Sequence, residues 1–153
     1  MSMQHSARVG LLAAVAAVLA SCGTAATAEV PPATVTHIAG SQVSRLQLTD
    51  QAIHRLGITT QPVREVPAAA GKSSARAGTR TVIPYSAVVY DTDGSTWTYV
   101  NTAARTYVRQ PIKITAIRGH TAVLSGGPAA GAAVVTAGAP ELLGTEFDIS
   151  GEE

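Results

Sequence analysis

The sequence predicts a mainly β protein, a small antiparallel β-barrel or β-sandwich with one short helix. Apolar and polar residues alternate with a period of two in several segments, as they do in half-buried strands. Clusters of Gly, Asp and Pro separate these segments with turn chemistry. Helical spacing between two capping residues is found at residues 50–56. With 153 residues, 46% of them apolar and 14% charged, the chain has enough apolar material for one compact domain.

Residues 1–21 are predicted to be a signal peptide. Arg8 is followed by an uncharged apolar run of twelve residues, 9–20. This is the length of a signal sequence, whereas a membrane-spanning helix needs about 20 apolar residues. The sequence therefore predicts an exported protein. Its single cysteine, Cys22, excludes an internal disulfide.

The signal segment ends in Leu19-Ala20-Ser21-Cys22, which resembles the lipobox of bacterial lipoproteins. The resemblance implies that Cys22 is acylated, with palmitate as one expected acyl group, and becomes the new N-terminus. It also implies that the protein is anchored at the extracytoplasmic face of the bacterial cytoplasmic membrane. Two acyl chains are the number that stable anchoring requires. The alternatives are ordinary signal cleavage at 24–26 or 26–28, and a free buried thiol.

The exported part is predicted to be one domain between two short terminal segments. Residues 22–40 are small, polar and proline-bearing without a period, which predicts a flexible tether. The β-rich domain is expected at 41–147. Residues 67–80, rich in Ala, Gly and Ser with three positive charges, interrupt it as a linker. Residues 148–153 form an acidic tail.

The front of the domain is predicted to read strand, helix, strand. Residues 43–48 alternate in polarity as a half-buried strand does. Thr49 suits the N-cap and Gly57 the C′ position of a two-turn helix over 50–56. Residues 58–66 return to β-rich composition.

The back of the domain is predicted to be a series of strands. Residues 82–90 form a strand broken by Pro84, a turn follows at 91–94, and 96–100 return as the second strand of a hairpin. A long strand is expected over 106–117. Its core face would carry Val108, Ile112, Ile114 and Ala116, and its solvent face Tyr107, Arg109, Lys113 and Thr115. A turn at 118–120 and strands at 121–124 and 133–136 complete the series.

Several of these segments carry motifs in a fixed order. They are Leu46-Gln47-Leu48-Thr49, Leu56-Gly57-Ile58 and Pro62-Val63, then Val82-Ile83-Pro84 with Ala87-Val88, and finally Val123-Leu124-Ser125-Gly126 with Gly131, Val134-Val135-Thr136 and Gly138. This series resembles the periplasmic adaptor (membrane fusion) proteins of tripartite efflux systems over most of residues 43–143. The resemblance implies a domain like the membrane-proximal part of those adaptors.

The chain departs from the adaptor pattern at one place. Full adaptors carry a lipoyl-like domain and a long helical hairpin where this chain has only residues 67–80. The resemblance therefore implies a truncated adaptor, a lipid-anchored extracytoplasmic accessory that binds a membrane transporter of the efflux or ABC-exporter type. The alternative is a stand-alone lipoprotein that binds a small ligand or the cell wall. A deep pocket lined by aromatic residues would favour the alternative, and an exposed, flat, partly basic sheet face would favour the adaptor.

The candidate partner-binding residues are Trp97, Tyr99, Tyr107, Arg109 and Lys113. The three aromatic side chains are candidates for an exposed contact surface, although aromatic residues in short strands also serve as core or cross-strand pairs. The two basic side chains are candidates to meet anionic headgroups or an acidic transporter surface, although such a face is also often merely solvated.

The sequence predicts no chemistry of its own. No Ser lies in a G-x-S-x-G motif, and Cys22 would be blocked by lipid, so we expect no enzyme and no cofactor. His37, His54 and His120 lack metal-ligand spacing, and Asp91-x-Asp93-Gly94 lacks the later Gly and Glu of a calcium loop, so we expect no metal. A net charge of +1 without a basic run disfavours nucleic acid.

Overall fold

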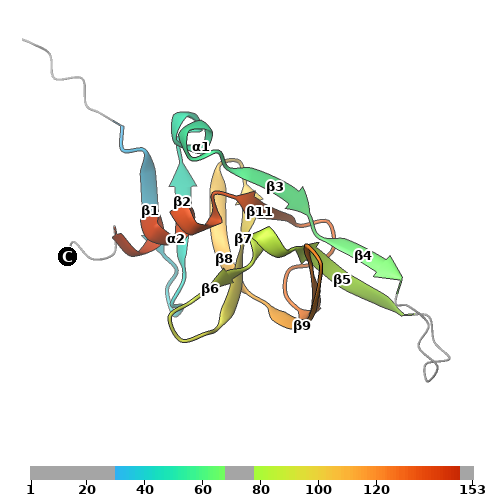
Figure 1. The fold of residues 1–153 in the computed structure, drawn as a ribbon. Helices are drawn as coiled ribbons and strands as arrows, with labels where there is room; N and C mark the ends of the chain where they lie inside the picture. Colours follow the sequence, from blue (N-terminus) through green and yellow to red (C-terminus); the bar gives the residue numbers. More distant parts are fainter. Residues whose placement is uncertain (1–29, 68–77, 149–153) are drawn as a thin grey trace, which may run out of the picture.

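The computed structural model describes residues 30–67 and 78–148 (Figure 1). The predicted signal peptide, Cys22, the first part of the predicted tether, most of the predicted linker and residues 149–153 lie outside the described residues. No helix in the described ranges is long and apolar enough to cross a membrane.

The described residues form two antiparallel sheets and two α-helices, which confirms the mainly β prediction (Figure 1). The seven-stranded sheet contains β1 (Ala33–His37), β2 (Ser44–Leu48), β3 (Thr59–Pro62), β6 (Val89–Tyr90), β7 (Thr96–Ala103), β8 (Thr106–Pro111) and β11 (Ala133–Ala137). The four-stranded sheet contains β4 (Arg64–Pro67), β5 (Thr79–Pro84), β9 (Lys113–Arg118) and β10 (Thr121–Gly126). The helices are α1 (Asp50–Leu56) and α2 (Ala139–Asp148), and a 3₁₀ turn, η1 (Tyr85–Ala87), precedes β6.

Strand order shows how the sheets are built. The seven-stranded sheet runs β1-β2-β8-β7-β11-β3, with β6 also paired to β7, and the four-stranded sheet runs β4-β5-β10-β9. Within the described residues the end strands of each sheet do not pair with each other, so neither sheet closes into a barrel. Over the same residues the chain passes from one sheet to the other four times, between β3 and β4, β5 and β6, β8 and β9, and β10 and β11.

Helix α1 forms as its capping residues predict. The Thr49 side-chain oxygen accepts a hydrogen bond from the backbone N–H of Ala52 at 3.2 Å. Gly57 takes the left-handed conformation with φ of 62° and ends the helix. Both caps are local in sequence, which is why the sequence alone locates this helix.

Strand β1 lies within residues 22–40, the range predicted to be a flexible tether. Residues 33–37 pair antiparallel with β2, from Ala33 opposite Leu48 to His37 opposite Ser44. Ala33 and Val35 are half-buried against the core, and the intervening residues are exposed. The alternation in this short segment is that of an edge strand. The tether assignment is therefore wrong for the residues of β1.

The long strand expected over 106–117 is two strands in different sheets. β8 ends at Pro111, which has no N–H to donate, and β9 begins at Lys113 after the buried Ile112. In β9 the predicted facing is right, since Ile114 and Ala116 are half-buried. In β8 it is reversed, because the change of sheet shifts the alternation by one residue.

Helix α2 is a second helix, whereas the sequence pattern predicts only one. Gly138, with φ of 82°, ends β11, and Ala139 and Pro140 open the helix, where a proline costs no hydrogen bond. Leu142 and Glu146, four residues apart, are buried on one face. This face lies against β1 and β2 (Figure 1).

Two clusters of buried side chains form the core. One joins the seven-stranded sheet to both helices and contains Leu46, Leu48, Ala52, Val89, Tyr99, Tyr107, Val135, Ala139 and Leu142. The other lies where the two sheets meet and contains Val63, Ile83, Ala87, Val100, Ile112, Ala122, Leu124 and Val134. Val63 and Ile112 stand at two of the points where the chain changes sheets, so burial of these side chains fixes both crossings.

Candidate binding surface

The structure separates the five predicted partner-binding residues. Tyr99, Tyr107 and Arg109 are buried, with 0%, 4% and 4% of their surface exposed. Trp97 is half-buried, and Lys113 is exposed on β9 in the other sheet. The prediction of an exposed contact surface is therefore wrong for Tyr99, Tyr107 and Arg109. The side chains of Tyr107 and Arg109 point inward because of the facing of β8.

Arg109 lies at the centre of a buried polar network. Its Nη1 donates to Oδ2 of Asp91 at 2.5 Å. Its Nε lies 3.4 Å from Oε2 of Glu146, close enough for an ion pair but without hydrogen-bond alignment. Its guanidinium carbon lies 4.5 Å from the centre of the Trp97 ring and 5.4 Å from that of Phe147. Charge and ring contacts together keep this cation inside the protein.

Glu146 connects helix α2 to three strands through this network. Its Oε1 accepts the backbone N–H of Ser44 at 3.0 Å, and its Oε2 accepts the hydroxyl of Tyr99 at 2.5 Å. Burial, and then the hydrogen bond to Glu146, raise the pKa of Tyr99, so this hydroxyl stays protonated. The arrangement fixes α2 on the sheet and leaves these groups with a structural role.

Asp91 supplies the outer end of the network, where the chain turns between β6 and β7. The backbone N–H of Thr92 donates to its carboxylate at 2.7 Å. This hydrogen bond, followed by that from Arg109, holds the pKa of Asp91 below its usual range. The turn predicted at 91–94 is therefore confirmed, and it also neutralises part of the charge of Arg109.

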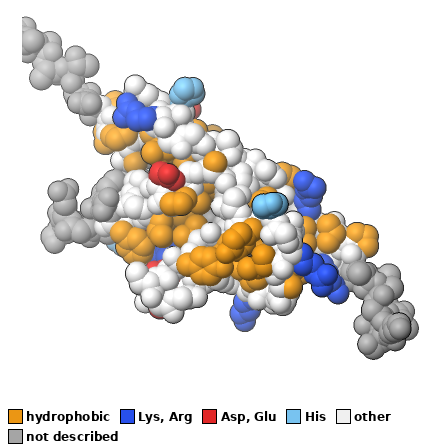
Figure 2. Space-filling model, in the orientation of Figure 1, with side chains coloured by type: hydrophobic (Ala, Val, Ile, Leu, Met, Phe, Trp, Pro, Cys, Tyr) orange, Lys and Arg blue, Asp and Glu red, His pale blue; other side chains and the backbone are white. Residues whose placement is uncertain are grey.

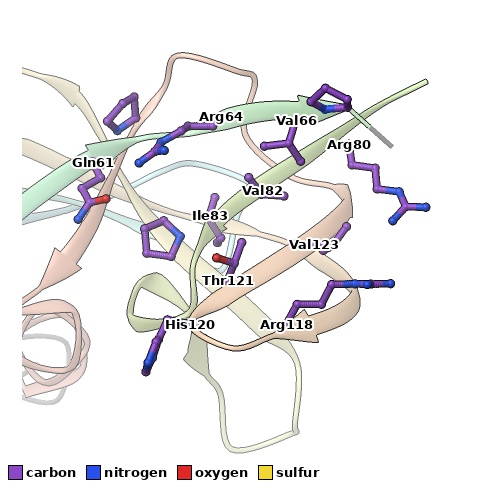
Figure 3. A pocket seen from close by; sticks show the side chains of 13 residues that line it. Gln61, Arg64, Val66, Arg80, Val82, Ile83, Arg118, His120, Thr121 and Val123 are labelled. Atoms are coloured by element: carbon purple, nitrogen blue, oxygen red, sulfur yellow. The ribbon is translucent and has the colours of Figure 1, made fainter. Parts of the chain in front are cut away.

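A separate cavity lies on the four-stranded sheet. It is an open groove of about 540 Å³ over the sheet face that carries Val82 and Val123, and Ile83 of the second core cluster also lines it (Figure 3). Val82 and Val123 lie on its floor and keep only 9% and 8% of their surface exposed. Arg64, Arg80 and Arg118 line it around them (Figure 3).

Strand pairing places one arginine in each of three successive rows across this face. The first row pairs Val66 with Arg80, the second pairs Arg64 with Val82 and Val82 with Val123, and the third pairs Pro84 with Thr121 and Thr121 with Arg118. Directly paired residues share a face, and alternate residues of a strand repeat at about 7 Å. The positive charges are therefore spread along the strands as well as across them.

The groove is basic and contains no aromatic Phe, Trp or Tyr in its lining. No carboxylate of the described residues lines it, and none forms an ion pair with the three arginines. His120 lies at one end (Figure 3). Figure 2 shows Lys and Arg side chains gathered over the end of the molecule that contains β4 and β5. The groove thus combines positive charge with an apolar floor.

An exposed tyrosine pair adjoins the groove. Tyr85 and Tyr90 are 39% and 50% exposed, and their hydroxyls lie 3.3 Å apart. This hydrogen bond raises the pKa of Tyr90. The backbone N–H of Tyr85 donates to the carbonyl of His120 at 2.8 Å, which places the pair beside one end of the groove. Figure 2 shows hydrophobic side chains gathered in this region, over η1 and β6.

Sequence reasoning missed the groove because its arginines come from three separate segments. Arg64, Arg80 and Arg118 each stand near a valine or threonine in an alternating strand, a pattern also typical of a solvated face. Only the pairing of β4, β5, β9 and β10 brings them to one face. Glu146 was missed as well, because it lies on the unpredicted helix α2 and its partners lie on distant strands.

No metal site is found among the described residues, since they contain no group of three or more His, Cys, Asp and Glu side chains close enough to hold an ion. In comparisons with known proteins, no family model matches the chain, and no curated protein matches it.

Proposed function

We propose that the protein is a lipid-anchored extracytoplasmic accessory that binds a membrane transporter through the groove on its four-stranded sheet. The observation that carries this proposal is an open sheet face with an apolar floor, flanked by three arginines that no described carboxylate neutralises. Arginine and apolar contacts are characteristic of protein interfaces. A positively charged face also steers encounter with an acidic partner.

The groove differs from what a stand-alone ligand-binding lipoprotein requires. Small-molecule sites enclose most of their ligand and are usually lined by aromatic and other apolar side chains. Here the tyrosines in the described strands lie in the core or outside the groove, and the groove opens along the sheet. This arrangement favours a protein partner over a small ligand.

The ends of β4 and β5 support the resemblance to a truncated adaptor. Pro67 lies opposite Thr79, so the chain leaves the four-stranded sheet and returns to it at the same point. Full adaptors carry their lipoyl-like domain and helical hairpin between the corresponding strands. Removing those parts leaves the pairing of β4 with β5 unaffected, which is consistent with a functional core that lacks them.

The acyl anchor proposed at Cys22 would hold the groove close to the membrane. Confining the protein to the membrane raises its effective concentration beside a membrane partner. Membrane anchoring is the first binding step, so binding of the transporter by the groove is in effect intramolecular. A small contact area in the groove is then enough to keep the transporter bound. The protein performs no chemistry in this proposal.

The test is to identify what the protein binds in living cells. The chain is tagged after Glu153 and crosslinked in its host, the membranes are solubilised in mild detergent, and co-isolated proteins are identified by mass spectrometry. We expect a transporter subunit with the natural chain and its loss with Cys22→Ser. We also expect its loss with the double substitution Arg64→Glu and Arg118→Glu, which reverses two groove charges.

A matched control uses exposed arginines outside the groove. Arg45→Glu on β2 combined with Arg55→Glu on α1 makes the same change in net charge. This control is expected to retain the transporter subunit. Recovery of cell-wall fragments, of a small molecule or of nothing with the natural chain would contradict the proposal and favour the stand-alone lipoprotein.

A further inference from the structure

We propose that the groove binds an extended acidic segment of its protein partner, with carboxylates separated by small apolar residues. This inference rests on the proposed function and names the kind of surface that the partner must offer. It starts from the three rows of the groove, each of which holds one arginine.

The spread of positive charge selects an extended ligand. Arg80, Arg64 and Arg118 stand in successive rows about 7 Å apart along the strands, and Arg118 on β9 also lies three strands, roughly 14 Å, across the sheet from Arg64 on β4. A single carboxylate or phosphate reaches only one of them. A peptide in extended conformation covers such a distance with about five residues. Its carboxylates then reach arginines on both sides of the groove, Arg64 and Arg80 on one and Arg118 on the other, in the fork geometry that favours this pair.

The floor of the groove selects against a uniformly charged polymer. Val82 and Val123 occupy the space between the arginines. A fully charged chain would place anions over these valines and lose their hydration without compensation. Small apolar residues between the acidic ones bury the remaining surface of these valines and that of Val66, which lines the groove and is 36% exposed. The favoured sequence is therefore a mixture of acidic and small apolar residues.

The shape of the groove argues against the membrane surface itself. A bilayer presents a broad surface, which would meet the arginines at the rim but not the valines on the floor. Peripheral membrane binding uses apolar side chains that project into the lipid. Val82 and Val123 are almost covered, so they do not project. The occupant must be narrow enough to enter the groove, as a single extended chain is.

The experiment measures binding of synthetic peptides to the protein purified from its host membranes and placed in nanodiscs of neutral phosphatidylcholine. The probe is a fluorescein-labelled octapeptide of four Glu-Val repeats, followed by fluorescence anisotropy at low salt. The control peptide has four Lys-Val repeats. We expect saturable binding of the acidic peptide alone, with affinity that falls as salt is raised.

Substitutions then locate the site. Arg64→Glu or Arg118→Glu is expected to weaken binding of the acidic peptide about tenfold or more. Arg64→Gln, which removes the charge with less perturbation, is expected to weaken it by a smaller factor. The same substitution outside the groove, Arg45→Glu, is expected to leave the affinity unchanged. Circular dichroism of each variant establishes that it is folded before its affinity is compared.

Several outcomes would overturn the inference. Equal affinity for the acidic and basic peptides would do so, as would equal weakening by Arg45→Glu and Arg64→Glu. Binding of phosphatidylglycerol vesicles that depends on the groove arginines, without peptide binding, would assign the groove to the membrane. If the transporter subunit is still lost with Arg64→Glu and Arg118→Glu in cells but the peptide does not bind, the proposed function stands and the inference fails. If the peptide binds but no transporter subunit is co-isolated, the groove's preference for acidic peptides stands and the proposed function fails.

Discussion

Arg109 of the seven-stranded sheet and the groove arginines of the four-stranded sheet have opposite environments. Arg109 in the seven-stranded sheet is 4% exposed and lies among Asp91, Glu146 and Trp97. Arg64 and Arg118 in the four-stranded sheet line an open groove, beside valines and without a described carboxylate. The comparison shows that an arginine on an alternating strand becomes structural when distant segments bring carboxylates to it. Where they do not, its charge has no described carboxylate beside it.

The largest expected effect comes from removing the buried carboxylate. Glu146→Ala leaves the buried Arg109 without one of its two acidic neighbours and removes the acceptor of the Ser44 N–H and the Tyr99 hydroxyl. Breaking a buried ion pair from one side costs about 3–5 kcal/mol of unfolding free energy. Urea unfolding measures the loss. Glu141→Ala, at an exposed position of the same helix, should change stability by less than about 0.5 kcal/mol.

A smaller loss is expected from the tyrosine that hydrogen-bonds this carboxylate. Tyr99→Phe removes a hydrogen bond to a charged group, which is worth about 1.5–3 kcal/mol. The matched control is Tyr107→Phe, also buried, whose hydroxyl interacts with the neutral side chain of Asn101. It should cost about 0.5–1.5 kcal/mol. Equal losses in the two variants would show that the charge of Glu146 adds nothing at this position.

The contribution of Asp91 is expected to depend on pH. The N–H of Thr92 and then Arg109 hold the pKa of Asp91 below its usual range, so its folded-state pKa lies below its unfolded value. Its stabilisation is fully present above the unfolded pKa of about 3.9 and is lost as pH falls through the folded pKa. The difference in melting temperature between the natural chain and Asp91→Asn should therefore narrow below about pH 4. A difference that stayed constant from pH 6 to pH 2.5 on thermal scans would contradict this assignment.

The smallest expected effect on stability comes from the groove. Arg64→Glu removes a side chain that no described carboxylate pairs with, so the unfolding free energy should change by less than about 0.5 kcal/mol. Reduced repulsion with Arg80 and Arg118 makes a slight gain the expected direction. Urea unfolding of the same preparations used for peptide binding provides the check. A loss above 2 kcal/mol would give these arginines the structural role of Arg109 and remove the contrast.

The parts of the fold that could be predicted from the sequence are those fixed by neighbouring residues. Helix α1 depends on Thr49 and Gly57, which lie next to it, and the turn at 91–94 depends on its own residues. Helix α2 carried a usable signal, because Pro140 suits a first turn and Leu142 and Glu146 have helical spacing. The Gly at 144 weakened that signal.

The candidate site could not be predicted in the same way. The direction of Tyr107 and Arg109 depends on which sheet contains β8, and the chain changes sheets at Ile112. A shift of one residue in an alternating strand exchanges its two faces. The groove depends on register between strands that lie far apart in sequence, as where Val82 pairs with Val123, and a period of two within each strand contains no information about that register.

The four crossings between the sheets also bear on how the protein unfolds. Each sheet is built from segments separated in the chain by segments of the other, so neither sheet is a continuous stretch of sequence that could fold by itself. Separating the sheets would draw Val63 and Ile112 out of the buried cluster where they meet. Hydrogen exchange should therefore show the slowest amides of both sheets opening in one concerted event with a common free energy. The four-stranded sheet that forms the groove is then expected to open only together with the seven-stranded sheet.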